Sequence, residues 1–81
     1  MTTLSKKESL QLLDQLIADQ ERKLLACARQ FVPRITPDDL LQPNDFPALE
    51  LNPYFRHEEG ILDGLRIAAT AFRCLKPASA S

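Results

Sequence analysis

The amino-acid sequence predicts an all-α protein: a long antiparallel helical hairpin with a short helix in its proline-rich connection, two copies of which associate into a four-helix bundle. Two long segments carry apolar residues at helical spacing and have no proline in their interior. Five of the six prolines fall within residues 33–53, between these segments. With two glycines and five aromatic residues among 81, an all-β sandwich or barrel is excluded. We expect residues 1–81 to form a single domain.

The first helix is expected to span about residues 6–32. Residues 2–32 contain neither glycine nor proline, and apolar side chains recur three and four residues apart, with one polar interruption at Gln20. This row consists of Leu10, Leu13, Ile17, Leu24, Cys27 and Phe31. Ser5 and Glu8 have the spacing of a capping box, in which each side chain accepts a hydrogen bond from the backbone N–H of the other residue.

Residues 33–52 form the connection, which ends the first helix because the residue before a proline avoids helical geometry. Thr36 followed by Pro37 is typical of a helix start, since threonine caps the helix and proline suits its first position. A short helix is therefore expected at about residues 37–42.

The second helix is expected to span about residues 53–76, with Asn52 as its cap and Pro53 at its first position. Its main apolar row consists of Tyr54, Ile61, Leu65, Ala68, Phe72 and Leu75, and the row is widened by Phe55, Leu62 and Ala69. Residues 77–81 are expected to form a frayed tail.

The two helices should lie antiparallel, so that the numbers of facing residues add up to about 86. A pair of helices cannot bury wide apolar faces on both members. The expected surplus consists of Leu12, Leu16, Leu25, Leu62 and Ala69. A homodimer that completes a four-helix bundle is the most economical way to cover it.

The chain contains two cysteines, Cys27 and Cys74, and one histidine. The expected hairpin places the cysteines about 20 Å or more apart, too far for a disulfide. We expect free thiols in a cytoplasmic protein.

The composition favours a small non-catalytic protein-interaction or assembly module, such as an adaptor, a chaperone-like factor or a regulator. A net charge of −1 makes nucleic acid an improbable partner, because strong binding to phosphates needs a basic surface. No apolar run approaches 18 residues, so no membrane span is expected. No catalytic, cofactor-binding or metal site is expected.

Two alternatives stay open at this point. The first is a small enzyme or enzyme subunit that uses Cys27 or the acidic cluster of His57, Glu58 and Glu59. The second is a weak nucleic-acid-associated regulator that uses the basic residues of the first helix. The hairpin would bring Cys27 near His57, but a cysteine in a helix seam is more often part of the core.

Two groups of residues are candidates for contacts with other surfaces. Phe46, Leu49, Tyr54 and Phe55 either bind a partner or cap the end of the hairpin. Gly60, Gly64 and Ala68 form a row of small residues that indicates close packing by another helix or by the connection.

Overall fold

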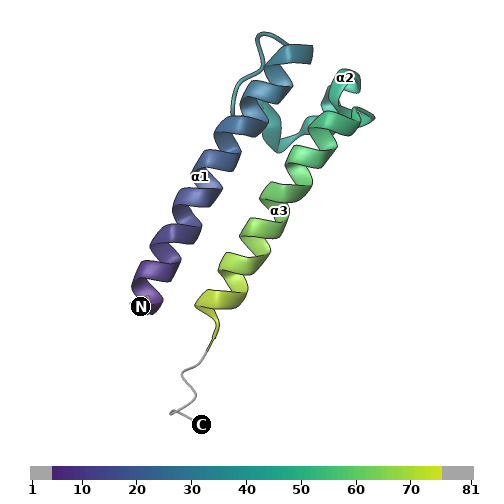
Figure 1. The fold of residues 1–81 in the computed structure, drawn as a ribbon. Coiled ribbons are helices and arrows are strands. Elements are labelled where there is room, and N and C mark those ends of the chain that lie inside the picture. The colour runs from purple at the N-terminus through teal and green to yellow at the C-terminus, as the bar shows by residue number, and fades with distance from the viewer. Residues whose placement is uncertain (1–4, 76–81) are drawn as a thin grey trace.

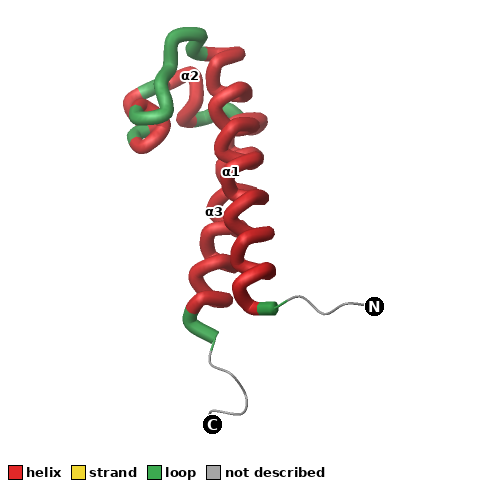
Figure 2. Tube along the Cα trace, turned by 90° about the vertical axis from the view of Figure 1, so that its left-hand side faces the viewer, coloured by secondary structure: helices red, strands yellow, loops and turns green. Residues whose placement is uncertain are grey.

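The computed structural model describes residues 5–75, which are mostly helical with no strand among them (Figure 1). The long helices α1 (Lys6–Phe31) and α3 (Pro53–Arg73) run antiparallel and side by side, as Figures 1 and 2 both show. The molecule measures 49 × 25 × 20 Å, so it is an elongated hairpin rather than a sphere. The expected frayed tail at residues 77–81 lies outside the described residues.

Both long helices begin where their caps predict. The Ser5 hydroxyl accepts a hydrogen bond from the Glu8 backbone N–H (3.1 Å), and the Glu8 carboxylate accepts one from the Ser5 N–H (3.3 Å). The Asn52 side-chain oxygen accepts hydrogen bonds from the N–H groups of Tyr54 and Phe55 (3.0 and 3.1 Å). These contacts satisfy backbone donors that have no partner inside a helix.

The connection holds more helical structure than expected. The predicted short helix is a single 3-10 turn, η1 (Asp39–Leu41), and Thr36 and Asp39 exchange side-chain to backbone hydrogen bonds (3.0 and 3.3 Å) at its start. A second 3-10 turn, η2 (Pro43–Asp45), and one turn of α-helix, α2 (Pro47–Glu50), follow and were not predicted. Each of these two turns has proline at its first position, which suits a helix start.

Four contacts between α1 and α3 test the expected alignment. The residue numbers add up to 87 in the ion pairs Glu21–Arg66 (3.2 Å) and Asp14–Arg73 (2.7 Å). They add up to 81 where Lys6 Nζ donates to the carbonyl oxygen of Leu75 (3.1 Å), and to 78 where Gln20 donates to Glu58. Since the values lie between 78 and 87, the expected sum of about 86 is right to within about two helical turns.

The core shows that one prediction about α3 was wrong. Leu62 and Ala69, which were expected to be surplus, are buried in the same row as Phe55. The buried apolar side chains are Leu24, Ala28, Ile35, Leu49, Phe55, Leu62 and Ala69. α3 carries two apolar rows about 100° apart, because adjacent helical residues differ by that angle. The row that faces α1 includes the small side chain of Ala69, which permits close approach of the two backbones.

The expected surplus on α1 is confirmed in part. Leu12 and Leu16 are exposed, at 51% and 42% of their full surface. Leu25 is half-buried, because it packs against the core cluster together with Leu40 of the connection. The hairpin therefore covers one side of α1 with its own connection and leaves the other side open.

Candidate interaction surface

One side of the hairpin is apolar and has no cover within the described chain. Its members are exposed or half-buried apolar residues of both long helices, together with Leu75 just beyond the end of α3, and we call them the open face: Leu12, Leu16, Ile61, Leu65, Ala68, Phe72 and Leu75. The α3 part of this face is the apolar row that the sequence predicted would pack against α1. That row points sideways instead, with Ile61 39% and Leu75 59% exposed.

The ion pairs lie on the opposite side of the hairpin. On α1, Asp14 stands between Leu12 and Leu16, and residues two apart lie on opposite flanks of a helix. On α3, Phe72 directly precedes Arg73, so their side chains diverge by about 100°. Asp14 and Arg73 form an ion pair at 2.7 Å, so charged side chains cover one side of the hairpin. The open face lies on the other side.

A cleft continues the open face toward the connection, between the last turns of α1 and the first turns of α3. We call it the turn-end cleft; its volume is about 730 Å³. Lys23 lies seven residues after Leu16, and Tyr54 lies seven before Ile61, so each stands on the same row as the open-face residue. Its lining includes the following polar and aromatic side chains: Lys23, Cys27, Gln30, Phe31, Tyr54, His57 and Glu58.

Cys27 and His57 both line this cleft, so the structure brings the proposed nucleophile and base to one place. No hydrogen bond joins them. Burial, and secondarily the negative charge of Glu58, raise the pKa of the Cys27 thiol. Since the thiolate is the reactive form, this environment disfavours a nucleophilic cysteine at neutral pH.

The acids next to His57 have structural partners. Glu58 accepts a hydrogen bond from Gln20 (2.5 Å), and Glu59 forms an ion pair with Arg56 (2.6 Å). Among residues 5–75, no group of three or more histidine, cysteine or acidic side chains is placed to hold a metal ion. Glu59 therefore belongs to a side-chain pair within α3, and Glu58 to a contact between α1 and α3.

The residues expected to bind a partner do not share one environment. Leu49 and Phe55 are fully buried, and Phe46 packs against the core. Only Tyr54 is exposed, at 72%. The first three therefore cap the end of the hairpin, as the alternative interpretation held, and Tyr54 alone remains on the surface. Sequence reasoning gave no role to Leu51, the most exposed of the large apolar residues in the described part.

No described residue outside α3 packs closely against the two glycines of the small-residue row. A Cβ atom placed on Gly60 or Gly64 would meet nothing within 4 Å, and Ala68 is exposed. The expected close approach by the connection or by the other helix of the chain is therefore wrong. The seam with α1 lies about half a turn away, at Leu62 and Ala69.

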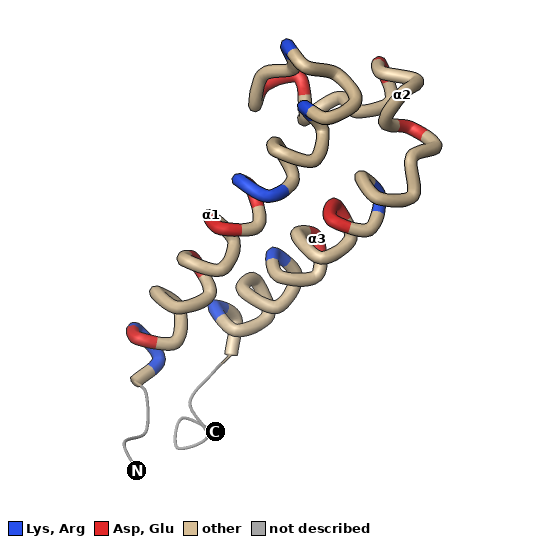
Figure 3. Tube along the Cα trace, turned by 45° about the horizontal axis from the view of Figure 1, so that its top comes forward, with Lys and Arg blue, Asp and Glu red and all other residues tan. Residues whose placement is uncertain are grey.

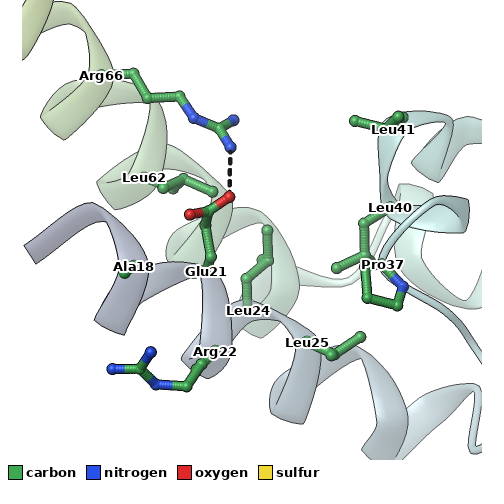
Figure 4. A pocket seen from close by; sticks show the side chains of 10 residues that line it. All are labelled: Ala18, Glu21, Arg22, Leu24, Leu25, Pro37, Leu40, Leu41, Leu62 and Arg66. Atoms are coloured by element: carbon green, nitrogen blue, oxygen red, sulfur yellow. Dashed lines mark hydrogen bonds and ion pairs between the residues drawn. The ribbon is translucent and has the colours of Figure 1, made fainter. Parts of the chain in front are cut away.

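A second hollow of about 380 Å³ lies where the connection crosses the hairpin (Figure 4). Leu24, Leu25 and Leu62 line one side, and Pro37, Leu40 and Leu41 line the other. The Glu21–Arg66 ion pair closes one end. The hollow is an open notch between the hairpin and the segment that contains η1, and Arg22 also lines it.

Two of the basic residues of α1 have partners within the chain. Arg22 pairs with Asp19, and Arg29 donates to the carbonyl oxygen of Ile35 (3.2 Å). Both long helices carry residues of both signs (Figure 3). Separately, neither long helix in the described part is apolar enough over a sufficient length to span a bilayer.

The described residues therefore form a two-helix hairpin. Its connection caps one end, and one of its sides is apolar and has no cover among the described residues. Comparison with protein-family models, with curated proteins and with solved structures gives no match to this chain.

Proposed function

We propose that this protein is a small non-catalytic interaction or assembly module, with an adaptor, chaperone-like or regulatory role, that acts as a homodimer. The observation that carries the proposal is the open face, where apolar side chains of both long helices remain uncovered on one side. Contiguous exposed apolar surfaces are typical of protein-binding sites. A second hairpin laid on this face would complete a four-helix bundle.

The side of the hairpin that carries the open face is large enough for a dimer. The 21 residues of α3 give a length of about 32 Å, and two packed helices give a width of about 20 Å. The footprint of this side is roughly 600 Å² per copy, at the lower end of the range of standard interfaces.

The small core of a single chain supports the same proposal. In residues 5–75, nine large hydrophobic side chains are exposed, whereas seven hydrophobic side chains are buried and two of those are alanines. Chains of this length have marginal cores and commonly gain stability by association. The two free cysteines support placing the module in the reducing cytoplasm.

Static light scattering on the whole protein at tens of micromolar tests this proposal. We expect a mass of about 18 kDa, twice the 9.1 kDa of the chain. The variant Ile61→Glu puts a charge on the open face and should be monomeric and still helical by circular dichroism. Ile67→Glu is the matched control, because Ile67 is 69% exposed and lies outside the open face. A folded wild-type monomer at these concentrations would refute the dimer.

A further inference from the structure

The turn-end cleft contains a cation without a counter-ion. Arg56, Arg66 and Arg73 each pair with a carboxylate, but Lys23 has no carboxylate within ion-pair distance in the described part of the chain. The cleft also exposes two aromatic rings, Phe31 and Tyr54. A cleft of this kind is a candidate for an interface, because aromatic residues are enriched at the centres of binding sites.

Two hairpins with two-fold symmetry can stack through the open face in two ways. With both connections at the same end, α1 of each copy lies on α3 of the other at equal height. With the connections at opposite ends, α1 lies on α1 and α3 lies on α3. The two arrangements place Lys23 in different surroundings.

The same-end arrangement gives Lys23 a partner. Within one chain, Gln20 touches Glu58, and Lys23 lies less than one helical turn beyond Gln20. Lys23 and Glu58 therefore lie at similar heights on the two helices. When α1 stacks on the partner's α3 at equal height, Lys23 lies next to Glu58 of the partner subunit. The turn-end clefts of the two copies then cover each other.

The opposite-end arrangement leaves Lys23 without a partner. The middle of α1 lies between residues 18 and 19, so a two-fold axis there sets Lys23 level with residue 14 of the other copy. The open-face residues at that height are Leu12 and Leu16, and an unpaired charge buried against leucine is strongly unfavourable. Sliding the copies apart until the partner's α1 ends before Lys23 would give up about a third of the contact length, because only residues 6–22 of α1 would stay in contact.

We infer that two copies dock with their connections at the same end, so that Lys23 of each chain meets Glu58 of the partner subunit. This inference rests on the proposed homodimer and adds the orientation and the charge pair that selects it. It joins the turn-end cleft and the open face into one continuous interface.

Cys74 supplies a distance test of the orientation, because it is exposed just beyond the end of α3. A nitroxide label on Cys74, in a Cys27→Ala background, reports the separation of the two copies by double electron–electron resonance. The same-end dimer places the labels at equal height on diagonal helices, about 20 Å apart. The opposite-end dimer places them at opposite ends, about 35 Å apart.

The outcomes separate this inference from the proposed function. A distance near 20 Å supports the same-end dimer. A distance near 35 Å in a particle of about 18 kDa overturns the orientation and leaves the dimer standing. A monomer without dipolar coupling overturns both.

A charge exchange tests the ion pair itself. Lys23→Glu should weaken dimerisation about tenfold at low salt, since the introduced carboxylate would face the carboxylate of Glu58, and Glu58→Lys should do the same with two cations. Glu58 also accepts a hydrogen bond from Gln20, so circular dichroism must first show that Glu58→Lys keeps the wild-type helicity. An equimolar mixture of the two variants should regain wild-type affinity, because the heterodimer pairs the introduced groups with each other and relieves the repulsion. Lys7→Glu is the control and should change the affinity less than twofold. A mixture no tighter than either variant alone would overturn the pairing.

Discussion

The side-chain amide of Gln20 donates hydrogen bonds to two oxygens of Glu58, the backbone carbonyl at 3.0 Å and the carboxylate at 2.5 Å. Gln20 is the one buried polar residue in the described part of the chain. A buried polar group restricts the ways in which helices can pack, because any other alignment leaves it without a partner. Sliding α1 along α3 by one turn would break both bonds, so this contact sets the height at which the helices meet.

Gln20→Ala should lower the free energy of unfolding by about 1–3 kcal/mol, because it leaves a half-buried carboxylate without its donor and opens a small cavity. Urea denaturation followed by circular dichroism measures the change. Gln15→Ala is a close control, since Gln15 also donates to an acid, Asp19 at 3.0 Å, but on the exposed surface. Its effect should stay within about 0.5 kcal/mol. Equal losses for the two variants would show that burial of Gln20 has no special role.

Adjacent residues of α3 should differ sharply in their effect on the fold. Leu62→Ala removes a buried side chain and should destabilise the chain by about 2–5 kcal/mol. Ile61→Ala, on the open face, should cost about 1 kcal/mol or less when the protein is dilute enough to be monomeric. Urea titrations at submicromolar concentration distinguish them. The reverse order would mean that α3 packs against α1 with the other row.

Leu49→Ser should lower the melting temperature by more than about 10 °C, because Leu49 of the connection is fully buried in the core cluster. Leu51→Ser changes a leucine two residues away that is 89% exposed, and its melting temperature should be nearly unchanged. A wild-type melt for Leu49→Ser, combined with lost association, would instead return Leu49 to the interaction surface.

Gly64→Ala should stabilise the monomer by about 0.5–1 kcal/mol. Alanine favours the helix more than glycine does, and the added methyl group has open space around it. Thermal melts of dilute protein measure the gain. A loss of stability that grows with protein concentration would show that a second copy packs closely against this row.

The two thiols should react at different rates. Protein alkylated under denaturing conditions without reductant should carry two labels per chain, because both cysteines are free. In the native state at pH 8, Cys27 should react several-fold more slowly than Cys74, since its raised pKa leaves less thiolate and its side chain is half-buried. Raising the pH should increase the rate at Cys27. Mass spectrometry after timed quenching gives both rates, and equal rates would contradict the described burial.

Local chemistry made the helix ends predictable. The caps Ser5 and Asn52 act through neighbours within three residues, so their sequence contains all the information required. The prolines fixed the extent of the connection for the same reason. The turn of α2 was missed because four residues carry no periodicity, and its Leu49 becomes ordered only through burial against the hairpin.

Which row of α3 faces α1 could not be read from the sequence. Both Leu62 and Leu65 belong to rows with helical spacing, and the choice between them depends on contacts from another part of the chain. The same uncertainty affected the site: Phe55 and Tyr54 are adjacent aromatic residues, yet one is fully buried and the other is largely exposed. Adjacent residues of a helix point about 100° apart, so rotating α3 by the angle of one residue would bury one apolar row and expose the other.

The hairpin brings residues 5 and 75 to the same end, where Lys6 Nζ donates to the carbonyl oxygens of Arg73 (3.4 Å) and Leu75 (3.1 Å) (Figure 1). A pulling force applied through the two ends of the chain would act across the helices rather than along them. The contacts between α1 and α3 would break one after another, starting at Lys6. Resistance to such a force would be low until the rupture reached Gln20, and the buried cluster around the connection would be the last part to yield.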